Sequence, residues 1–161
     1  MLKINILCIG KVKEAYFSYA IAEYRKRLGA FCKCAVTELP EEKIRDNRPN
    51  AAQIDEVLQA EGKRILQKIG ASDYVIALCI EGKPLSSEEL AETLDRLALT
   101  GSSTVSFVIG GSYGLSDAVK QRAALRLSMS RMTFPHTLAR VLLTEQIYRA
   151  FEIRANGKYH K

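Results

Sequence analysis

Three segments in the second half of the chain combine flexible backbone with polar side chains, and each is a candidate for ligand binding. The first is SFVIGGSYGL, residues 106–115, in which an apolar run leads directly into a loop with three glycines. Glycine lets the backbone approach a ligand closely because no side chain stands in the way. The second segment is SMSRMTFPH, residues 128–136, and the third is the terminal NGKYHK.

The glycine loop matches neither of two common nucleotide-binding patterns. Its spacing is not G-x-G-x-x-G, and no acidic residue closes the next strand about 20 residues later to hold a ribose. The P-loop pattern G-x-x-x-x-G-K-[ST] is also missing. The loop therefore predicts either a site for a flat, mostly uncharged ligand or a simple turn between a strand and a helix.

The two histidines lie in different contexts. His136 follows Pro135 at the start of a predicted helix, where an imidazole either caps the helix or faces a ligand, and the structural role is the more common one. His160 lies beside Tyr159 near the end of the chain, where little core remains to explain an aromatic ring and an imidazole side by side. We therefore expect His160 to be the functional one.

Basic side chains concentrate toward the end of a basic chain. The sequence has 24 Lys and Arg against 18 Asp and Glu, a formal charge of +6, which suits a polyanionic partner but is also common in ordinary proteins. Such a concentration either neutralises phosphates or forms a solvated basic face. The arginines concerned are Arg122, Arg126, Arg131, Arg140, Arg149 and Arg154.

The composition predicts one globular domain over residues 1–161, with 47% hydrophobic and 26% charged residues. The four cysteines form no C-x-x-C pair, so we expect reduced thiols that pack as small hydrophobes, and neither a metal site nor disulfides. No apolar run approaches the roughly 20 residues of a membrane helix, and the apolar part of the N-terminus is too short for a signal peptide. We therefore expect a cytoplasmic protein without membrane contact.

Hydrophobic periodicity predicts alternating strands and helices. The predicted strands are 3–9, 32–39, 74–80, 104–109 and, briefly, 126–130; the predicted helices are 14–28, 52–69, 86–99, 117–125 and 136–155. The charged stretch PEEKIRDNRPN, residues 40–50, has no periodicity and reads as a mobile surface loop, either a solvated connector or a basic flap near a substrate. The last helix has more apolar positions than one face needs, which indicates a core element or a subunit interface.

This alternation is typical of an α/β fold with a parallel sheet and helices on both faces. In such sheets, ligands bind where the loops converge at the carboxyl ends of the strands. Three loops qualify for such a site: residues 81–84, 110–114 and 128–136.

The segments FVIGGSYGL, LSMSRMTFPHTLARVLLTEQIYRA and the terminal YHK closely resemble the RlmH family of SPOUT-class methyltransferases. The motifs fill the C-terminal third almost continuously, and the order of elements agrees over the whole chain. The resemblance implies transfer of a methyl group from S-adenosylmethionine to N3 of a pseudouridine in large-subunit (23S) ribosomal RNA. It also implies a SPOUT α/β trefoil-knot fold, which is an exception to the rule that chains are unknotted.

The resemblance also assigns site residues. The methyl donor would lie in the knot, cradled by backbone from three loops, and the partner's C-terminal tail would complete the active site of a homodimer. Arg149 and His160 are then the substrate-side, catalytic candidates. The residues that map to the donor site are Leu78, Gly110, Met129, Ser130, Arg131, Met132, Thr133 and Phe134.

Two mechanisms remain open from the sequence. N3 of a pseudouridine must lose its proton before it attacks a sulfonium methyl, and His160 would accept that proton directly or through water. Alternatively, basic residues stabilise the imide anion and the proton goes to solvent. Because the chain has little surface for reading RNA, we expect the assembled ribosome to be the substrate. The rival interpretations are a ribosome-binding module without activity and another small-molecule enzyme on a Rossmann-like sheet.

Overall fold

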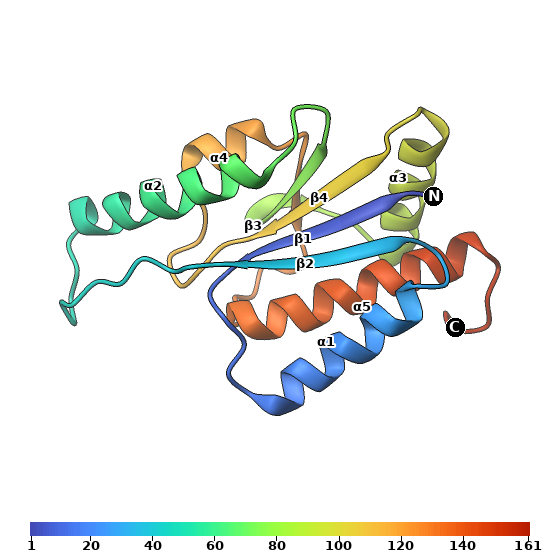
Figure 1. The fold of residues 1–161 in the computed structure, drawn as a ribbon, viewed down its shortest axis with the longest axis horizontal. Coiled ribbons are helices and arrows are strands. Elements are labelled where there is room, and N and C mark those ends of the chain that lie inside the picture. The colour runs from blue at the N-terminus through green and yellow to red at the C-terminus, as the bar shows by residue number, and fades with distance from the viewer.

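A computed structural model describes residues 1–161 and has the predicted α/β architecture (Figure 1). Strands and helices alternate along the whole chain, and every predicted element is present. In chain order they are β1 (Lys3–Ile9), α1 (Ala15–Leu28), β2 (Lys33–Leu39), α2 (Ala51–Lys68), β3 (Tyr74–Pro84), α3 (Ser87–Leu99), β4 (Thr104–Ile109), α4 (Asp117–Arg122), β5 (Leu125–Ser128) and α5 (His136–Arg154).

The five strands form one parallel sheet in the order β2-β1-β4-β3-β5. Helices α1, α3 and α5 pack on one face around Ile4, Phe107 and Leu143, and α2 and α4 cover the other around Val75 and Val119 (Figure 1). Burying a side chain of this size stabilises the fold by roughly 1.5–3 kcal/mol relative to exposing it. The sheet is thus covered on both faces, as predicted.

Strand β3 runs further than the periodicity indicated, because it meets β5 twice. Leu127 of β5 pairs with both Leu78 and Lys83 of β3, so residues 79–82 bulge outward between the two pairings. A Cβ on Gly82 would lie 2.7 Å from the carbonyl oxygen of Arg126, which leaves room only for glycine. This bulge forms one wall of the cleft described below.

Local side-chain bonds determine where α3 begins, whereas a long-range backbone bond determines where α4 ends. A capping box begins α3: Ser86 Oγ accepts from the Glu89 N–H at 3.1 Å, and the Glu89 carboxylate accepts from the Ser86 N–H at 2.7 Å. Helix α4 is shorter than predicted, since it ends at Arg122 and the Ala124 N–H donates to the Val75 carbonyl oxygen instead. The prediction that α4 reaches Leu125 was wrong, because pairing in the sheet takes over there.

All four cysteines are free thiols, as predicted. Burial raises the pKa of Cys8 and that of Cys32 to about 12, so both thiols stay protonated. None of the helices is both long and apolar enough to cross a bilayer. No group of three or more His, Cys, Asp or Glu side chains lies in a position to hold a metal ion.

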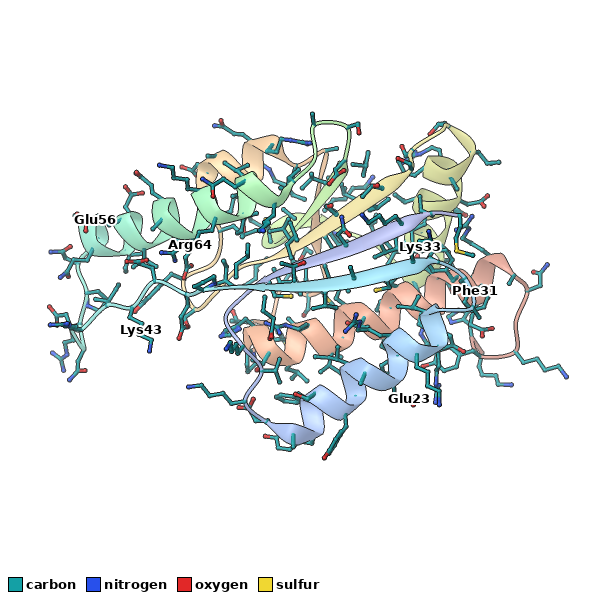
Figure 2. The ribbon with its side chains drawn as sticks, in the orientation of Figure 1. Glu23, Phe31, Lys33, Lys43, Glu56 and Arg64 are labelled. Carbon is teal, nitrogen blue, oxygen red and sulfur yellow. The ribbon has the colours of Figure 1, made fainter.

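The stretch between β2 and α2 is anchored to α2 at its start (Figure 2). Arg64 donates to the Pro40 carbonyl oxygen at 3.0 Å and pairs with the Glu42 carboxylate, and the Glu42 N–H donates to Glu61 at 3.0 Å. These bonds hold the first residues of the predicted mobile loop and direct Lys43 toward the carboxyl end of the sheet. The first residues of the stretch are therefore held in place, and most of the residues that follow are exposed.

Candidate functional site

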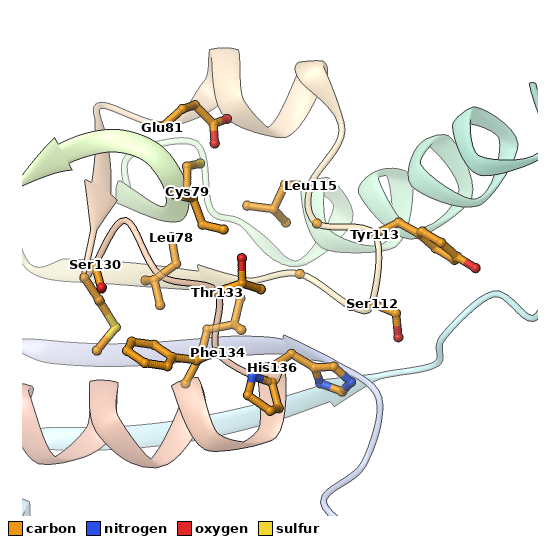
Figure 3. A pocket seen from close by; sticks show the side chains of 18 of the residues that line it. Leu78, Cys79, Glu81, Ser112, Tyr113, Leu115, Ser130, Thr133, Phe134 and His136 are labelled. Atoms are coloured by element: carbon orange, nitrogen blue, oxygen red, sulfur yellow. The ribbon is translucent and has the colours of Figure 1, made fainter. Parts of the chain in front are cut away.

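A cleft of about 840 Å³ opens at the carboxyl ends of β3 and β4, where the three predicted loops converge (Figure 3). Eleven of its 21 lining residues are hydrophobic, so it suits a ligand with flat apolar parts. In Figure 3, Cys79 and Glu81 of the β3 bulge lie across the cleft from Phe134 and His136. The predicted donor residues that line it are Leu78, Gly110, Met129, Ser130, Met132, Thr133 and Phe134; Arg131 is not among the lining residues.

The glycine loop is shaped so tightly that side chains are excluded from it. A Cβ on Gly110 would lie 2.3 Å from the carbonyl oxygen of Gly114, and one on Gly111 would lie 3.1 Å from Ile9 Cγ2. Gly114 has φ +87°, a conformation that side chains disfavour, and its N–H donates to Gly111 O at 3.1 Å. The glycines therefore shape the cleft wall and are more than turn residues.

The segment between β5 and α5 is fixed by two serine hydroxyls. The buried Ser128 hydroxyl donates to the carbonyl oxygen of Ser130 at 3.2 Å, and Ser130 Oγ accepts from the Met132 N–H at 3.0 Å. These bonds turn the backbone toward the cleft and leave the Met132 side chain 75% exposed at the rim. An exposed apolar side chain at a cleft mouth fits contact with a ligand or a partner.

His136 and an ion pair supply the polar part of the cleft lining. Burial, together with the positive charge of Arg140, lowers the pKa of His136, so its imidazole is neutral at pH 7. On the opposite rim, Lys120 pairs with Glu81 at 2.6 Å, which lowers the pKa of Glu81 and raises that of Lys120. The cleft therefore has no unpaired charge on these walls.

The two predicted catalytic residues lie together in a tail cluster formed by Glu88, Glu145, Arg149, Tyr159 and His160. The Glu145 carboxylate accepts from Arg149 at 2.6 Å and from the Tyr159 hydroxyl at 2.8 Å. Arg149 lies 3.1 Å from His160 Nδ1, and His160 Nε2 lies 2.8 Å from Glu88. Because a guanidinium only donates, Nδ1 accepts and the Nε2–H donates to the carboxylate. His160 therefore has no free lone pair here.

The tail cluster and the cleft lie at opposite ends of α5. Ala139 is the last residue of α5 that lines the cleft, and the helix rises about 15 Å from there to Arg149. Figure 1 shows the C-terminus beside the carboxyl end of α5, far from the carboxyl ends of the strands. One copy of the chain therefore does not bring Arg149 and His160 to its own cleft.

The family model described as "Predicted SPOUT methyltransferase" matches residues 2–160. The chain belongs to the SPOUT methyltransferase family. The family match spans the glycine loop, the segment before α5 and the tail, and so covers every candidate site residue named above.

Related proteins match this chain over almost its whole length. Proteins called "Ribosomal RNA large subunit methyltransferase H" are 52% identical in Bacillus pumilus, 50% in Clostridioides difficile and 49% in Leuconostoc mesenteroides, each over 99% of this chain and 100% of the relative. A solved structure, described as a probable methylase family protein from Haemophilus influenzae, has a TM-score of 0.53 at 15% identity. That match covers 98% of this chain and 70% of the other, and it supports the fold.

Most arginines of the basic C-terminal region bond to other groups of the protein. Arg140 is only 2% exposed and pairs with Glu38 at 2.6 Å, and Arg122 donates to backbone carbonyl oxygens at the start of β3. Arg154 pairs with Asp95 at 3.1 Å. These three arginines, although near one another in the sequence, therefore bond to different parts of the structure.

The sequence analysis did not predict that the carboxylate of Glu61 is buried. Glu61 is 4% exposed, and burial raises its pKa. Its side chain lies beside the glycine loop, 3.3 Å from where a Cβ on Gly111 would be. The signal was present, because position 61 lies one turn from each of the buried Val57 and Ile65 on the apolar face of α2.

Proposed function

We propose that this protein is an S-adenosylmethionine-dependent methyltransferase that modifies N3 of a pseudouridine in large-subunit ribosomal RNA. The glycine-walled cleft is the observation that carries this proposal, because it offers backbone and apolar surface at the carboxyl ends of the strands. The family, the names of the relatives and the sequence resemblance support the same reaction. A ribosomal substrate would place the protein in the cytoplasm.

The cleft fits S-adenosylmethionine in size and chemistry. A volume of about 840 Å³ lies within the range of roughly 300–1,000 Å³ that is typical of small-molecule sites. The donor has no phosphate, which agrees with the missing phosphate-binding motifs. Leu78, Gly110 and the segment from Met129 to Phe134 would hold it through backbone and apolar contacts, with the Arg131 side chain outside. When bound, the donor supplies an electrophilic methyl group on a sulfonium sulfur.

The bonding of the tail cluster favours one of the two mechanisms. His160 uses its only lone pair to accept from Arg149, so it is unable to take the N3 proton while that bond lasts. We infer that the positive charge of Arg149 stabilises the imide anion and that the proton leaves to water. A His160→Ala variant with a low rate but an unchanged pH–rate profile would support this role, whereas loss of a titrating limb would identify His160 as the base.

We infer a homodimer in which the tail cluster of one copy meets the cleft of the other. The length of α5 separates the two regions within a single copy. The apolar side chains of Leu138, Val141 and Leu142 on α5 are only half-buried, which leaves an apolar helix surface available for a partner. A second copy packed against α5 would cover this surface and complete both sites.

We also infer that the chain is threaded as the SPOUT trefoil knot. The double pairing of Leu127 with Leu78 and Lys83 supports this, because it holds an irregular part of β3 against β5 just before the segment that leads into α5. The knot and the single-domain assignment stay predictions.

The decisive experiment offers two substrates to the purified protein with methyl-labelled S-adenosylmethionine. One is ribosomes from cells that lack this methyltransferase, and the other is the same RNA stripped of protein. We expect label on the intact ribosomes, at N3 of a pseudouridine, and little on the naked RNA. Ribosome binding that is sensitive to salt, without donor binding or label, would instead indicate a binding module. Strong labelling of naked RNA would contradict the assembled ribosome as substrate.

A further inference from the structure

A second cleft of about 640 Å³ adjoins the first, and the two share His136. It lies between the β1–α1 connection, the end of β2 and the start of α5, and only one of its 11 lining residues is hydrophobic. We call it the polar cleft. Its remaining charged side chains are Lys11, Lys13, Glu14, Glu38, Glu41 and Lys43.

We propose that the polar cleft binds the acceptor nucleotide, with the base toward Glu14 and His136 and the backbone phosphate on Lys11, Lys13 and Lys43. This inference rests on the proposed function, because a methyl acceptor must reach the donor. A base in the polar cleft would lie beside the first cleft, in which we propose that the donor binds, because His136 lines both clefts. Because all but one of the lining residues are not hydrophobic, the polar cleft suits a charged nucleotide better than it suits the methyl donor.

Unpartnered buried polar atoms are the strongest sign that a ligand belongs here. The whole chain has four buried side-chain nitrogen or oxygen atoms without a hydrogen bond, and two of them, Glu14 Oε2 and His136 Nδ1, belong to residues that line the polar cleft. A third, Arg140 Nε, belongs to a side chain that bonds to the lining residues Glu38 and Gly10. Such atoms are rare in folded proteins because each loses its bonds to water without replacement. A ligand that carries N–H groups and carbonyl oxygens would satisfy the two atoms of the lining residues.

The floor of the polar cleft is built before any ligand arrives. The buried guanidinium of Arg140 donates to the Glu38 carboxylate at 2.6 Å and to the Gly10 carbonyl oxygen at 3.1 Å. The same Glu38 oxygen accepts from the Val12 N–H at 3.2 Å. These bonds fix the β1–α1 connection and so orient Lys11 and Lys13.

The three lysines of the polar cleft form no ion pair within the protein. Lys43 reaches the cleft because Glu61 and Arg64 anchor the residues before it. Unpaired ammonium groups from two separate loops, on either side of a pocket, suit the phosphates that flank a bound nucleotide. The alternative occupant is the partner's tail, but its own lysines would then face these three lysines.

Glu14 gives the polar cleft a way to distinguish pseudouridine from uridine. Pseudouridine carries an additional ring N–H that uridine lacks, and a carboxylate only accepts hydrogen bonds at neutral pH. A bond from this N–H to Glu14 would be lost with uridine, which leaves the carboxylate oxygen buried without a partner. We therefore expect the cleft to favour pseudouridine.

The first test titrates isotope-labelled protein, saturated with S-adenosylhomocysteine, with pseudouridine 5′-monophosphate and then with uridine 5′-monophosphate. We expect the largest amide shifts at Gly10–Glu14 and Lys43, and tighter binding of the pseudouridine nucleotide. A Lys11→Ala, Lys13→Ala, Lys43→Ala triple variant should bind at least about tenfold more weakly, and Glu14→Gln should lose the preference for pseudouridine. Lys63→Ala and Glu56→Gln, exposed on α2, are the matched controls. Shifts elsewhere, or binding that survives the triple variant, would overturn the proposal.

The second test measures ribosome methylation by the same variants. We expect the triple variant to raise the KM for ribosomes about tenfold while its donor affinity stays that of the wild type. An unchanged KM would overturn the polar cleft and leave the proposed function standing. If the wild-type protein binds the nucleotide in the polar cleft but labels no ribosome, the proposed function is overturned and the polar cleft stands as a nucleotide site. Amide shifts at Lys11 and Lys43 on removal of residues 159–161, without nucleotide, would assign the cleft to the partner's tail and overturn the proposal.

Discussion

The donor cleft, at the amino end of α5, is lined mostly by backbone and apolar side chains, whereas at the carboxyl end of the helix charged and aromatic side chains bond to one another. The donor cleft is shaped by glycines that exclude side chains, and the tail cluster is shaped by Glu145, which accepts from both Arg149 and Tyr159. A backbone-built site is sensitive to added volume, and a side-chain network is sensitive to lost partners. The two regions should therefore fail in different ways when mutated.

The largest effect should come from adding volume to the glycine loop. A Gly110→Val variant would place a Cβ 2.3 Å from the Gly114 carbonyl oxygen, so the loop must move. We expect at least about 100-fold weaker donor binding, or about 2.7 kcal/mol, by calorimetry. Ala52→Val adds volume at an exposed position outside the cleft, and this variant should bind the donor normally. Unchanged donor affinity in the valine variant would show that the loop does not hold the donor.

A mixing experiment tests whether the two ends of α5 work together across a dimer. Gly110→Val and His160→Ala should each be nearly inactive, but exchange of subunits creates mixed dimers that contain one intact cleft facing one intact tail. Random exchange makes half the dimers mixed, each with one working site, so we expect methylation at about a quarter of the wild-type rate. Activity no higher than that of either variant alone would mean that each tail serves its own subunit.

Breaking the buried ion pair beneath the polar cleft should be the next largest effect. Arg140→Met leaves the Glu38 carboxylate without its partner, but the Glu38 side chain is 37% exposed, so water replaces part of the lost interaction. We expect a loss of about 2 kcal/mol in the free energy of unfolding, measured with urea. Arg27→Met breaks the exposed pair with Glu23 and should hardly move the midpoint. Equal losses of unfolding free energy in both variants would mean that the burial of Arg140 does not strengthen its ion pair.

The smallest effect concerns pH and the buried carboxylate behind the glycine loop. Burial raises the pKa of Glu61 in the folded protein above its value in the unfolded chain. The folded state therefore loses stability as the pH rises from the pKa of the unfolded chain through that of the folded protein. Glu61→Gln removes this titration. We expect the unfolding free energy of the variant to gain on that of the wild type as the pH rises from 4 to 7, and a constant difference would contradict the shift.

The comparison also separates what the sequence could predict from what it could not. The elements and the convergence of three loops followed from periodicity and glycine spacing, because these are local signals. The burial of Arg140 did not follow, since its partner Glu38 lies 102 positions away and no local pattern reports such a pair. The end of α4 was misplaced for a related reason, because the backbone bond from Ala124 to Val75 is formed only in the complete sheet.

The strand order has a consequence for how this protein is made. Strand β1 pairs with β2 on one side but with β4 on the other, and β4 is translated only after α2, β3 and α3. At about 5–20 residues per second, the edge of β1 that pairs with β4 waits on the order of several seconds for its partner. During that time an apolar strand edge is exposed on the translating ribosome. We therefore expect chaperone contact with the nascent chain to end as β4 emerges.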